Sequence, residues 1–492
     1  MGTFTASDLV PLLPAIIFTL GAIAVLLSEV FLGHSPTRHY QPAITSVTCV
    51  GAALACIPVL GEPSRPIFSG MAVADSFSGV ISLMVAAGLL IATLTAASFL
   101  HRHHIERGEF YALALFGAAG MSLLSLSADL LMIFVSLEVM SVAVYALTAY
   151  LRRGARPAEA AFKYFLLGAF SSAIYIYGTA LIYGAVGTTQ LHEIAHAAHG
   201  GLLLTAGVVF VAAGFAFKVA AVPFHMWTPD VYEGAPTPVT AFMAVGVKAA
   251  AFAALLRVMV IAFPGALSAP LWGDLLVVLA ILTMIVGNLL AVPQRNVKRM
   301  LAYSSVAHAG YLLLGVAAAQ GSAMAISQAG SGVLFYLFTY TAAGAGAFAV
   351  VAGLERDDPE AIAAWDLDRF AGLARRRPMM ALGMTVFLAS LAGIPPFAGF
   401  IGKLYIFRAA IDSGLLGAAI VGVLTSVLGA YYYLRVVVYM YMRPAEEHQK
   451  IAPSSMPLSA ALWIAAALTV WLGIGPGPLA DLARASAQAL GG

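Results

Sequence analysis

Charged residues are scarce in this chain. Only 10% of its 492 residues are Asp, Glu, Lys or Arg, whereas 61% are hydrophobic. A water-soluble protein of this length would need far more charge to cover its surface, so the composition excludes that class and indicates an integral membrane protein. The formal net charge is only +2, which provides no basic field to attract nucleic acid.

Motifs for metals and cofactors are also missing. The two cysteines, Cys49 and Cys56, share one apolar stretch, where we expect them to be small core residues and not metal ligands. No haem-attachment, iron–sulfur, dinucleotide-binding or P-loop pattern occurs. The sequence therefore predicts no metal site and no cofactor-binding site in this chain.

Long apolar runs occupy most of the chain. A spanning helix needs roughly 20 apolar residues, and about fourteen runs meet that need: 9–32, 42–60, 77–100, 110–127, 129–150, 160–186, 202–222, 236–262, 274–292, 299–318, 330–353, 379–411, 414–442 and 456–475. No Lys or Arg precedes Arg38, so the first run lacks the positive start of a cleavable signal peptide and is expected to be a retained span. The predicted fold class is an all-α polytopic membrane protein of about fourteen transmembrane helices.

The loop cations predict the orientation of these helices. Only Arg65 and Arg484 lie in the loops after even-numbered spans and in the C-terminal tail. Sixteen Lys and Arg residues follow odd-numbered spans: Arg38, Arg102, Arg107, Arg152, Arg153, Arg156, Arg295, Lys298, Arg299, Arg356, Arg369, Arg375, Arg376, Arg377, Arg443 and Lys450. Cytoplasmic loops carry the excess of Lys and Arg. We therefore expect a bacterial inner-membrane protein whose two termini both lie on the non-cytoplasmic side.

Two of the predicted spans carry helix breakers. Span twelve, 379–411, would be about 50 Å long as one helix, too long for a hydrocarbon core of about 30 Å, and it contains a Gly-Ile-Pro-Pro sequence from Gly393. Span seven runs into Pro223 and a polar stretch. Paired breaks in corresponding spans of two halves point to an ion or substrate site in transporters.

The spacing of the two breaks predicts an internal repeat. They fall five spans apart, which suggests one five-helix repeat in spans 4–8 and a second in spans 9–13, inverted because the number of helices is odd. The expected segments are a three-helix N-terminal part (1–108), the first antiporter-like repeat (109–263), the second, inverted repeat (274–442) and a C-terminal span and tail (443–492).

Five ionisable residues lie within apolar spans: Glu138, Lys163, Lys218, Lys248 and Lys403. Each would cost about 2.5–3.5 kcal/mol at mid-membrane unless it faces a partner or water. For any one of them a structural ion pair is the alternative, but four lysines and one carboxylate cannot all neutralise one another. A desolvated lysine whose carboxylate partner can move away binds and releases a proton. The set therefore indicates charge transfer across the bilayer, as in a proton pump.

Other polar residues within spans have simpler explanations. Arg257, Arg408 and Arg435 lie toward span ends, where interfacial anchoring is expected. His308 is more typical of a hydrogen-bonded core residue, whereas His225, at the break of span seven, is a candidate proton relay.

The polar linker 355–377 is expected either to form a short amphipathic cytoplasmic helix or to be solvated.

These residues lie in stretches that resemble the antiporter-like membrane subunits of respiratory complex I, and most closely the subunit N branch. The stretches are 137–141 (LEVMS), 159–164 (EAAFKY), 217–227 (FKVAAVPFHMW), 229–238 (PDVYEGAPTP), 296–305 (NVKRMLAYSS) and 391–403 (LAGIPPFAGFIGK). Lys403 stands where one sister branch generally has glutamate, and the chain stops soon after span fourteen, whereas another continues into a lateral helix. Both features favour the N branch.

The resemblance implies a function and a role for each charged residue. The implied function is proton translocation by a membrane subunit of NADH–quinone oxidoreductase, through two half-channels, driven by quinone reduction in partner subunits that hold NADH, FMN, iron–sulfur clusters and quinone. Glu138 would be the counter-charge of Lys218, Lys163 and Lys248 would continue a hydrated axis, and Lys403 would end the second half-channel. Two rival hypotheses stay open, namely a subunit of a multisubunit cation/proton antiporter and a non-pumping membrane scaffold.

Overall fold

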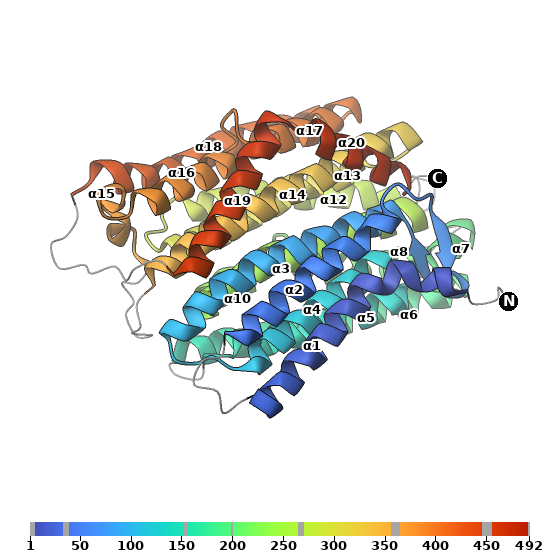
Figure 1. Cartoon of the computed structure of the whole chain (residues 1–492). Helices are drawn as coiled ribbons and strands as arrows, with labels where there is room; N and C mark the ends of the chain where they lie inside the picture. Colours follow the sequence, from blue (N-terminus) through green and yellow to red (C-terminus); the bar gives the residue numbers. More distant parts are fainter. Residues whose placement is uncertain are drawn as a thin grey trace.

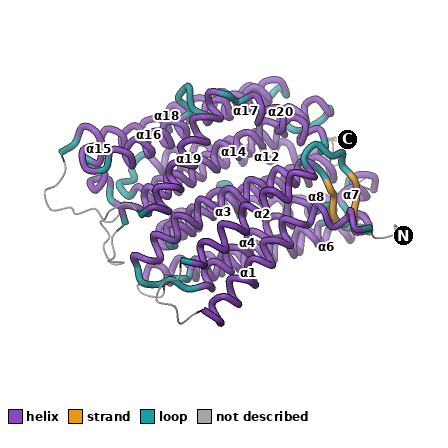
Figure 2. The backbone as a smooth tube through the Cα atoms, viewed as in Figure 1, coloured by secondary structure: helices purple, strands orange, loops and turns teal. Residues whose placement is uncertain are grey.

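The computed structural model describes residues 5–32, 39–151, 155–197, 200–263, 270–355, 365–444 and 455–490. Helices make up nearly all of it, and a small hairpin of β1 (Arg65–Ile67) and β2 (Ala72–Ala74) lies at one end of the bundle (Figure 2). The predicted all-α polytopic fold is confirmed. Five of the cations used for the orientation, Arg38, Arg152, Arg153, Arg356 and Lys450, lie outside the described residues.

Thirteen helices in the described part are long and apolar enough to cross a membrane. Twelve contain one principal α-helix each: α1 (Leu13–Leu32), α2 (Tyr40–Cys56), α3 (Ser76–Arg102), α4 (Gly108–Leu126), α5 (Leu130–Thr148), α6 (Ala155–Val186), α8 (Leu202–Val219), α12 (Pro270–Ala291), α13 (Val297–Ala318), α14 (Ala323–Leu354), α18 (Leu416–Met442) and α19 (Met456–Ile474). The other joins α10 (Thr237–Phe242), a π-helix η4 (Met243–Val247), α11 (Lys248–Arg257) and a second π-helix η5 (Val258–Ala262).

The remaining helices are shorter. They are α7 (Leu191–Ala197), α9 (Trp227–Gly234), α15 (Leu373–Arg376), α16 (Pro378–Ala392), α17 (Ala398–Asp412) and α20 (Gly477–Gln488). The predicted span 379–411 is divided between α16 and α17, so it is absent from the thirteen long helices. The division follows the prediction that Gly393 and the prolines break this span.

The two breaks share one local geometry. Ala220 ends α8 with φ 62°, and Gly393 ends α16 with φ 83°, both in the left-handed region. In each case the next backbone N–H returns to a carbonyl five residues earlier, Ala221 to Ala216 at 2.8 Å and Ile394 to Ala389 at 3.0 Å. This is the Schellman pattern, which satisfies carbonyls that a helix end would otherwise leave free.

The centre of the bundle is formed by α10–α11, α13 and α14. Most of their residues are buried, whereas α1, α2, α6, α18 and α19 leave apolar side chains exposed around the outside. In a membrane protein such exposed apolar faces contact lipid or other subunits. The first half of the chain and the second half form two adjoining groups of helices, and α3 packs against α14 between them (Figure 1).

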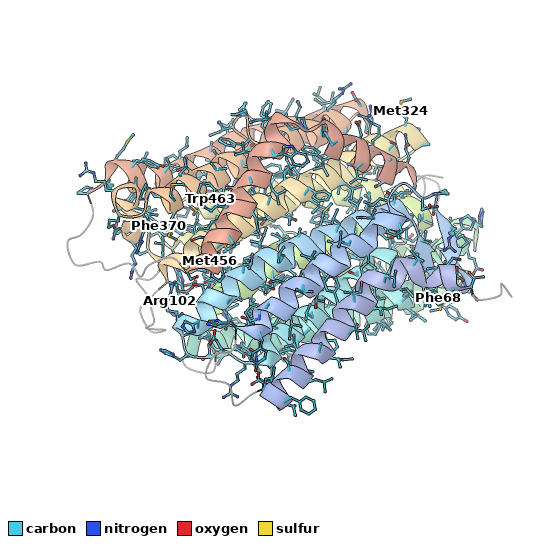
Figure 3. The ribbon with its side chains drawn as sticks, viewed as in Figure 1. Phe68, Arg102, Met324, Phe370, Met456 and Trp463 are labelled. Atoms are coloured by element: carbon cyan, nitrogen blue, oxygen red, sulfur yellow. The ribbon has the colours of Figure 1, made fainter. Side chains whose placement is uncertain are left out.

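Both described ends of the chain lie at the same end of the bundle (Figure 1). Arg65 at the hairpin pairs with Asp8 at 2.6 Å, and Ser76 at the start of α3 hydrogen-bonds Ser486 of α20 at 2.8 Å. Phe68 and Met324 mark this end in Figure 3, and Arg102 and Phe370 mark the opposite end. The opposite end is the one that the loop cations predict to be cytoplasmic.

Two sequence predictions about polar residues are wrong. Arg257 is not an interfacial anchor, because it is fully buried and forms a two-pronged ion pair with Asp75 at 2.8 and 3.1 Å. Lys298, counted as a loop cation, lies in the first turn of α13 and is also fully buried.

The linker 355–377 is only partly described. Glu355 is buried and accepts a hydrogen bond from Thr237, so the solvated alternative fails at that position. The described part from residue 365 forms a 3₁₀ turn, η7 (Leu367–Phe370), followed by α15.

Candidate functional site

The first buried lysine is Lys218, in the last turn of α8. Its ammonium donates to the Ser141 hydroxyl at 2.7 Å and contacts the Tyr145 hydroxyl at 3.3 Å, both on α5. Glu138, one turn before Ser141, accepts a hydrogen bond from Ser172 of α6. No nitrogen–oxygen contact within 4.0 Å joins Lys218 to Glu138 in the described part of the chain. Neutral hydroxyls, not the carboxylate, therefore hold the ammonium.

The break in span seven fixes the position of this lysine. Because α8 stops at Val219, the carbonyl of Phe217 lacks the donor four residues ahead that a continuing helix would supply. It accepts instead from the Ala220 amide and from the Trp227 indole, each at 3.1 Å. Trp227 also stacks on Tyr164 with ring centres 4.6 Å apart, and Tyr164 packs edge-on against Tyr145 at 4.7 Å. A row of aromatic rings thus leads from the lysine of α8 to the start of α9.

The second buried lysine is Lys248, at the junction of η4 and α11. Its ammonium donates to the backbone carbonyl of Ser305 on α13. A π-helical segment widens the helix and shifts its side-chain register, and such segments occur frequently at functional sites. Lys248 therefore projects across the helix interface toward α13, where it is almost fully buried.

The third buried lysine is Lys403, on α17. It donates to the carbonyls of Leu391 and Ala392 at 2.9 and 3.0 Å and to the Ser426 hydroxyl at 2.7 Å. Those two carbonyls end α16, so the break in span twelve supplies the acceptors for the lysine. The ammonium also lies 5.1 Å from the ring centre of Tyr311.

His308 of α13 lies between the second and third lysines. Its Nε2 contacts the Tyr433 hydroxyl at 2.9 Å, and its Nδ1 contacts the Tyr336 hydroxyl. Beside it is a cavity of about 10 Å³ lined by His308, Tyr336, Thr339, Tyr340, Ser390, Leu391 and Gly399. That space fits about one water molecule. His308 is hydrogen-bonded, as expected of a core histidine. It also lines this cavity together with Leu391, whose carbonyl accepts a hydrogen bond from Lys403.

Lys163 has a different environment from the other three lysines. It is 38% exposed and pairs with Glu159 at 2.6 Å and Asp230 at 2.8 Å. Arg299 completes the network by contacting Asp230 at 2.9 Å and Glu233 at 2.8 Å. We call these five residues the ionic cluster. It joins α6, α9 and α13.

His225 lies in the turn between α8 and α9 and is half-buried. The described contacts contain no hydrogen bond from it to Lys218 or Lys248. The structure thus places Lys218, Lys248 and Lys403 in the interior and leaves Lys163 and His225 nearer the surface.

Several residues around the lysines escaped the sequence analysis. Ser141 and Tyr145 follow Glu138 at three and seven residues, on one face of α5, and helical spacing alone would have identified them. Ser426 and Tyr311 come from other helices, and no local pattern links them to Lys403. Asp230 and Glu233 lay within a family-like stretch but were not recognised as partners of Lys163.

Comparison with known proteins decides the family. The family described as NADH:quinone oxidoreductase/Mrp antiporter, TM, matches residues 127–429. The chain belongs to this family. A relative from Myxococcus xanthus, named NADH-quinone oxidoreductase subunit N, is 53% identical over 96% of both chains. Another from Trichlorobacter lovleyi, with the same name, is 43% identical over 98% of this chain and 97% of its own. The predicted resemblance to the subunit N branch is confirmed.

Solved structures agree with this family. A chain of respiratory complex I from Thermus thermophilus is 36% identical, with a TM-score of 0.80, and the match covers 96% of this chain and 99% of that one. A chain of the Mrp complex from Dietzia is 24% identical, with a TM-score of 0.84 over 99% of this chain and 100% of that one. At that identity the Mrp likeness supports the fold alone.

Proposed function

We propose that this chain is the antiporter-like, proton-translocating subunit N of NADH–quinone oxidoreductase and moves protons along Lys218, Lys248 and Lys403. Its family membership and its full-length similarity to relatives of that name support the assignment. The other membrane subunits of the complex are its partners, and the bacterial inner membrane is its location. We expect NADH, FMN, iron–sulfur clusters and quinone to act in the partner subunits.

The observation that carries the proposal is the set of acceptors around the three lysines. Each buried ammonium contacts hydroxyl or carbonyl oxygens, and none has a carboxylate within 4.0 Å in the described part of the chain. A buried lysine held only by neutral oxygens gains little from staying charged, because desolvation disfavours the ammonium. Such a lysine binds and releases a proton when a neighbouring charge or water changes.

The geometry supports a sequence of proton-binding groups across the bundle. Glu138 lies on the same face of α5 as Ser141 and Tyr145, the two residues whose hydroxyls contact Lys218. Its negative charge can therefore favour the protonated form of Lys218 without direct contact. Lys248 contacts α13 at Ser305, and His308 lies one turn further along α13 beside the cavity. Lys403 ends the series on the far side of that cavity. Each group in this series becomes charged when it binds a proton and neutral when it passes that proton to the next group.

The experiment that tests the proposal replaces Lys218 with Arg in the whole complex. Arg keeps the positive charge and can donate to Ser141 and Tyr145, but a guanidinium does not deprotonate in proteins. If Lys218 carries protons, Lys218→Arg should assemble yet lose redox-driven proton pumping in sealed vesicles nearly as fully as Lys218→Ala. Pumping by the Arg variant at the wild-type rate would show that the charge only holds helices together.

Purification of the native complex tests the assignment to NADH–quinone oxidoreductase separately. Co-purified flavin, iron–sulfur clusters and quinone reductase activity are expected. A complex without redox centres that exchanges Na⁺ for protons would instead establish the antiporter alternative.

A further inference from the structure

We propose that Lys298 and Glu355 form an additional proton-exchanging pair, which links the ionic cluster to the lysine series. This inference rests on the function proposed above and adds two residues to it. The sequence analysis placed Lys298 among the loop cations and Glu355 in a linker. The structure places both in the interior, at the end of the bundle marked by Arg102 and Phe370 in Figure 3.

Lys298 is fully buried and has few partners. Its ammonium donates to one neutral acceptor, the carbonyl of Ala235 at the end of α9, at 2.6 Å. The Trp365 ring lies over it, with the centroid 4.7 Å from the nitrogen. One carbonyl and one ring face leave a buried ammonium poorly compensated, which is the condition under which a lysine exchanges its proton.

Glu355 is the buried carboxylate near this lysine. It follows α14, is 8% exposed, and accepts a hydrogen bond from the Thr237 hydroxyl at the start of α10. Its backbone carbonyl accepts from Arg102 at 3.0 Å, so the main chain is held in place while one carboxylate oxygen has Thr237 as its partner. The acceptor of Lys298, Ala235, and the donor to Glu355, Thr237, are only two residues apart at the junction of α9 and α10, which brings the carboxylate close to the lysine. Among the described contacts, no direct ion pair joins Lys298 to Glu355 or to Glu233. The carboxylate is thus positioned to stabilise the charged lysine without locking it.

The pair lies between the ionic cluster and the lysine series. Arg299, the next residue after Lys298, contacts Asp230 and Glu233 of the cluster. Further along α13, Ser305 follows Lys298 by seven residues, which is two turns, about 10 Å, on the same helix face. Ser305 is the residue whose carbonyl accepts from Lys248. A proton bound at Lys298 is therefore between a half-exposed group of charges and the second interior lysine.

A covering segment separates this pair from the surface. The Leu367 amide donates to the Arg295 carbonyl at 2.9 Å, and Asp368 pairs with Arg295 at 2.6 Å, so residues 365–370 are attached to the turn before α13. Trp365 is the residue of this segment that lies on Lys298. The Trp365 indole therefore covers the ammonium on the side of this segment.

A purely structural role is the competing explanation for Lys298. The ammonium ends α9 by binding the Ala235 carbonyl and stacks on Trp365, and Arg would do both, because guanidinium stacks on aromatic rings at least as well as ammonium does. A structural Lys298 is therefore replaceable by Arg, whereas a proton-exchanging Lys298 is not. This difference separates the two roles in an assembled complex.

The test measures redox-driven proton pumping and electron transfer of the whole complex in sealed vesicles, with assembly checked on native gels. Lys298→Arg should assemble and lose pumping by about a hundredfold or more, because a positioned proton-transfer group typically contributes about 10²–10⁴-fold. Glu355→Gln, which keeps an acceptor for Thr237, should also reduce pumping, and adding it to Lys298→Arg should cause little further loss. Arg408→Lys, a cation exchange at an exposed position outside the pair and its covering segment, is the matched control and should pump normally.

Comparison with Lys218→Arg keeps the two proposals apart. If Lys218→Arg fails to pump but Lys298→Arg and Glu355→Gln pump at the wild-type rate, the inference about this pair is wrong and the proposed function stands. If all three variants pump normally, the proposed function itself is wrong. If Lys298→Arg fails to assemble, Glu355→Gln decides the matter, since normal pumping by that variant overturns the pair.

Discussion

At the scale of single residues, Arg257 and Asp75 form the one ion pair in the described part of the chain whose two side chains are both buried. Both side chains are inaccessible to solvent, and Arg257 also donates to the Ser125 carbonyl at 2.9 Å. Asp75 in turn caps α3 by accepting from the Ser78 amide at 2.8 Å. One ion pair thus fixes the ends of α3, α4 and α11 to one another.

We predict that Asp75→Asn severely impairs assembly. The amide retains the cap on α3 but leaves a buried guanidinium without its counter-charge, and breaking a buried pair costs about 3–5 kcal/mol. The amount of intact complex in membranes and its thermal unfolding temperature measure the effect. Replacing both partners, Asp75→Asn with Arg257→Met, should recover part of the loss. If Asp75→Asn alone is as stable as the wild type, water must compensate the charge of the Arg257 guanidinium.

The ionic cluster has a predictable pH dependence. Burial alone would raise the pKa of Asp230, but hydrogen bonds from Lys163 and Arg299 outweigh it and lower this pKa below its ordinary value. Because the folded-state pKa is lowered, the contribution to stability is fully present above the ordinary Asp pKa of about 4 and disappears as the pH falls through the lower folded value. The stability difference between wild type and Asp230→Asn should therefore stay constant from about pH 7 to 5. A difference that shrinks already at pH 6 would contradict this assignment.

Residue identities were predictable to different degrees. An ionisable residue in an apolar run is visible in the sequence, so Lys218, Lys248 and Lys403 were identified without the structure. Their partners were visible only where they share a helix with another marked residue, as Ser141 does with Glu138. Lys298 was misplaced because the apolar run was taken to begin at residue 299, two residues after α13 begins at Val297. Arg257 was misread because its partner Asp75 is 182 residues away.

At the scale of elements, the two broken spans differ in one respect that predicts different mutational sensitivity. Gly393 has φ 83°, and a Cβ there would come within 3.0 Å of the Lys403 side chain. Ala220, at the matching position of the other break, already carries a Cβ at φ 62°. The break in α16–α17 therefore leaves no room for a side chain where the lysine passes, whereas the break after α8 does.

We predict that Gly393→Ala reduces pumping more than it reduces stability. The left-handed backbone costs an alanine about 1–2 kcal/mol, and the new methyl group also displaces Lys403 from the Leu391 and Ala392 carbonyls. Pumping in vesicles and the thermal unfolding temperature should be measured together. The matched variant Ala220→Gly relieves the same backbone cost and should leave both quantities close to wild type. Equal, small effects of the two substitutions would show that the Lys403 ammonium tolerates displacement.

The predicted inverted repeats remain a prediction at this scale. The Schellman ends of α8 and α16, and the equal lengths of α6 and α14, which hold corresponding positions in the expected repeats, support them. The π-helical segments of the eighth span had no signal in the sequence, because a π-turn depends on packing around the helix and not on residue type alone.

At the scale of the whole molecule, the orientation in the membrane is the open prediction that is simplest to test. The two described ends of the chain lie at the same end of the bundle, opposite Arg102 (Figures 1 and 3). A reporter fused after Gly492 should therefore lie outside the cytoplasm, and one inserted near Asp357 should lie inside. Reporters on the same side would mean that the predicted number of spans is wrong by an odd number.

The sequence predicted the overall architecture well, because each span must satisfy its own backbone hydrogen bonds and therefore leaves a separate apolar run. The number of long helices differs from the expected fourteen by one, since the divided span 379–411 is not a long helix. No sequence pattern of comparable strength predicted which helices pack against one another. That α10–α11, α13 and α14 form the centre was visible only in the structure.

The course of α19 has a consequence for how such a molecule can work. This helix runs obliquely across the bundle (Figure 1) and packs against α3 from the first half and against α14, α16 and α17 from the second. Many transporters alternate access by rocking one half against the other. Here such rocking would pull α19 away from one set of neighbours, and the buried contact between α3 and α14 would have to slide. We therefore expect the helices to keep their positions during turnover. Proton transfer would then depend on movements of the lysine side chains and of water between them.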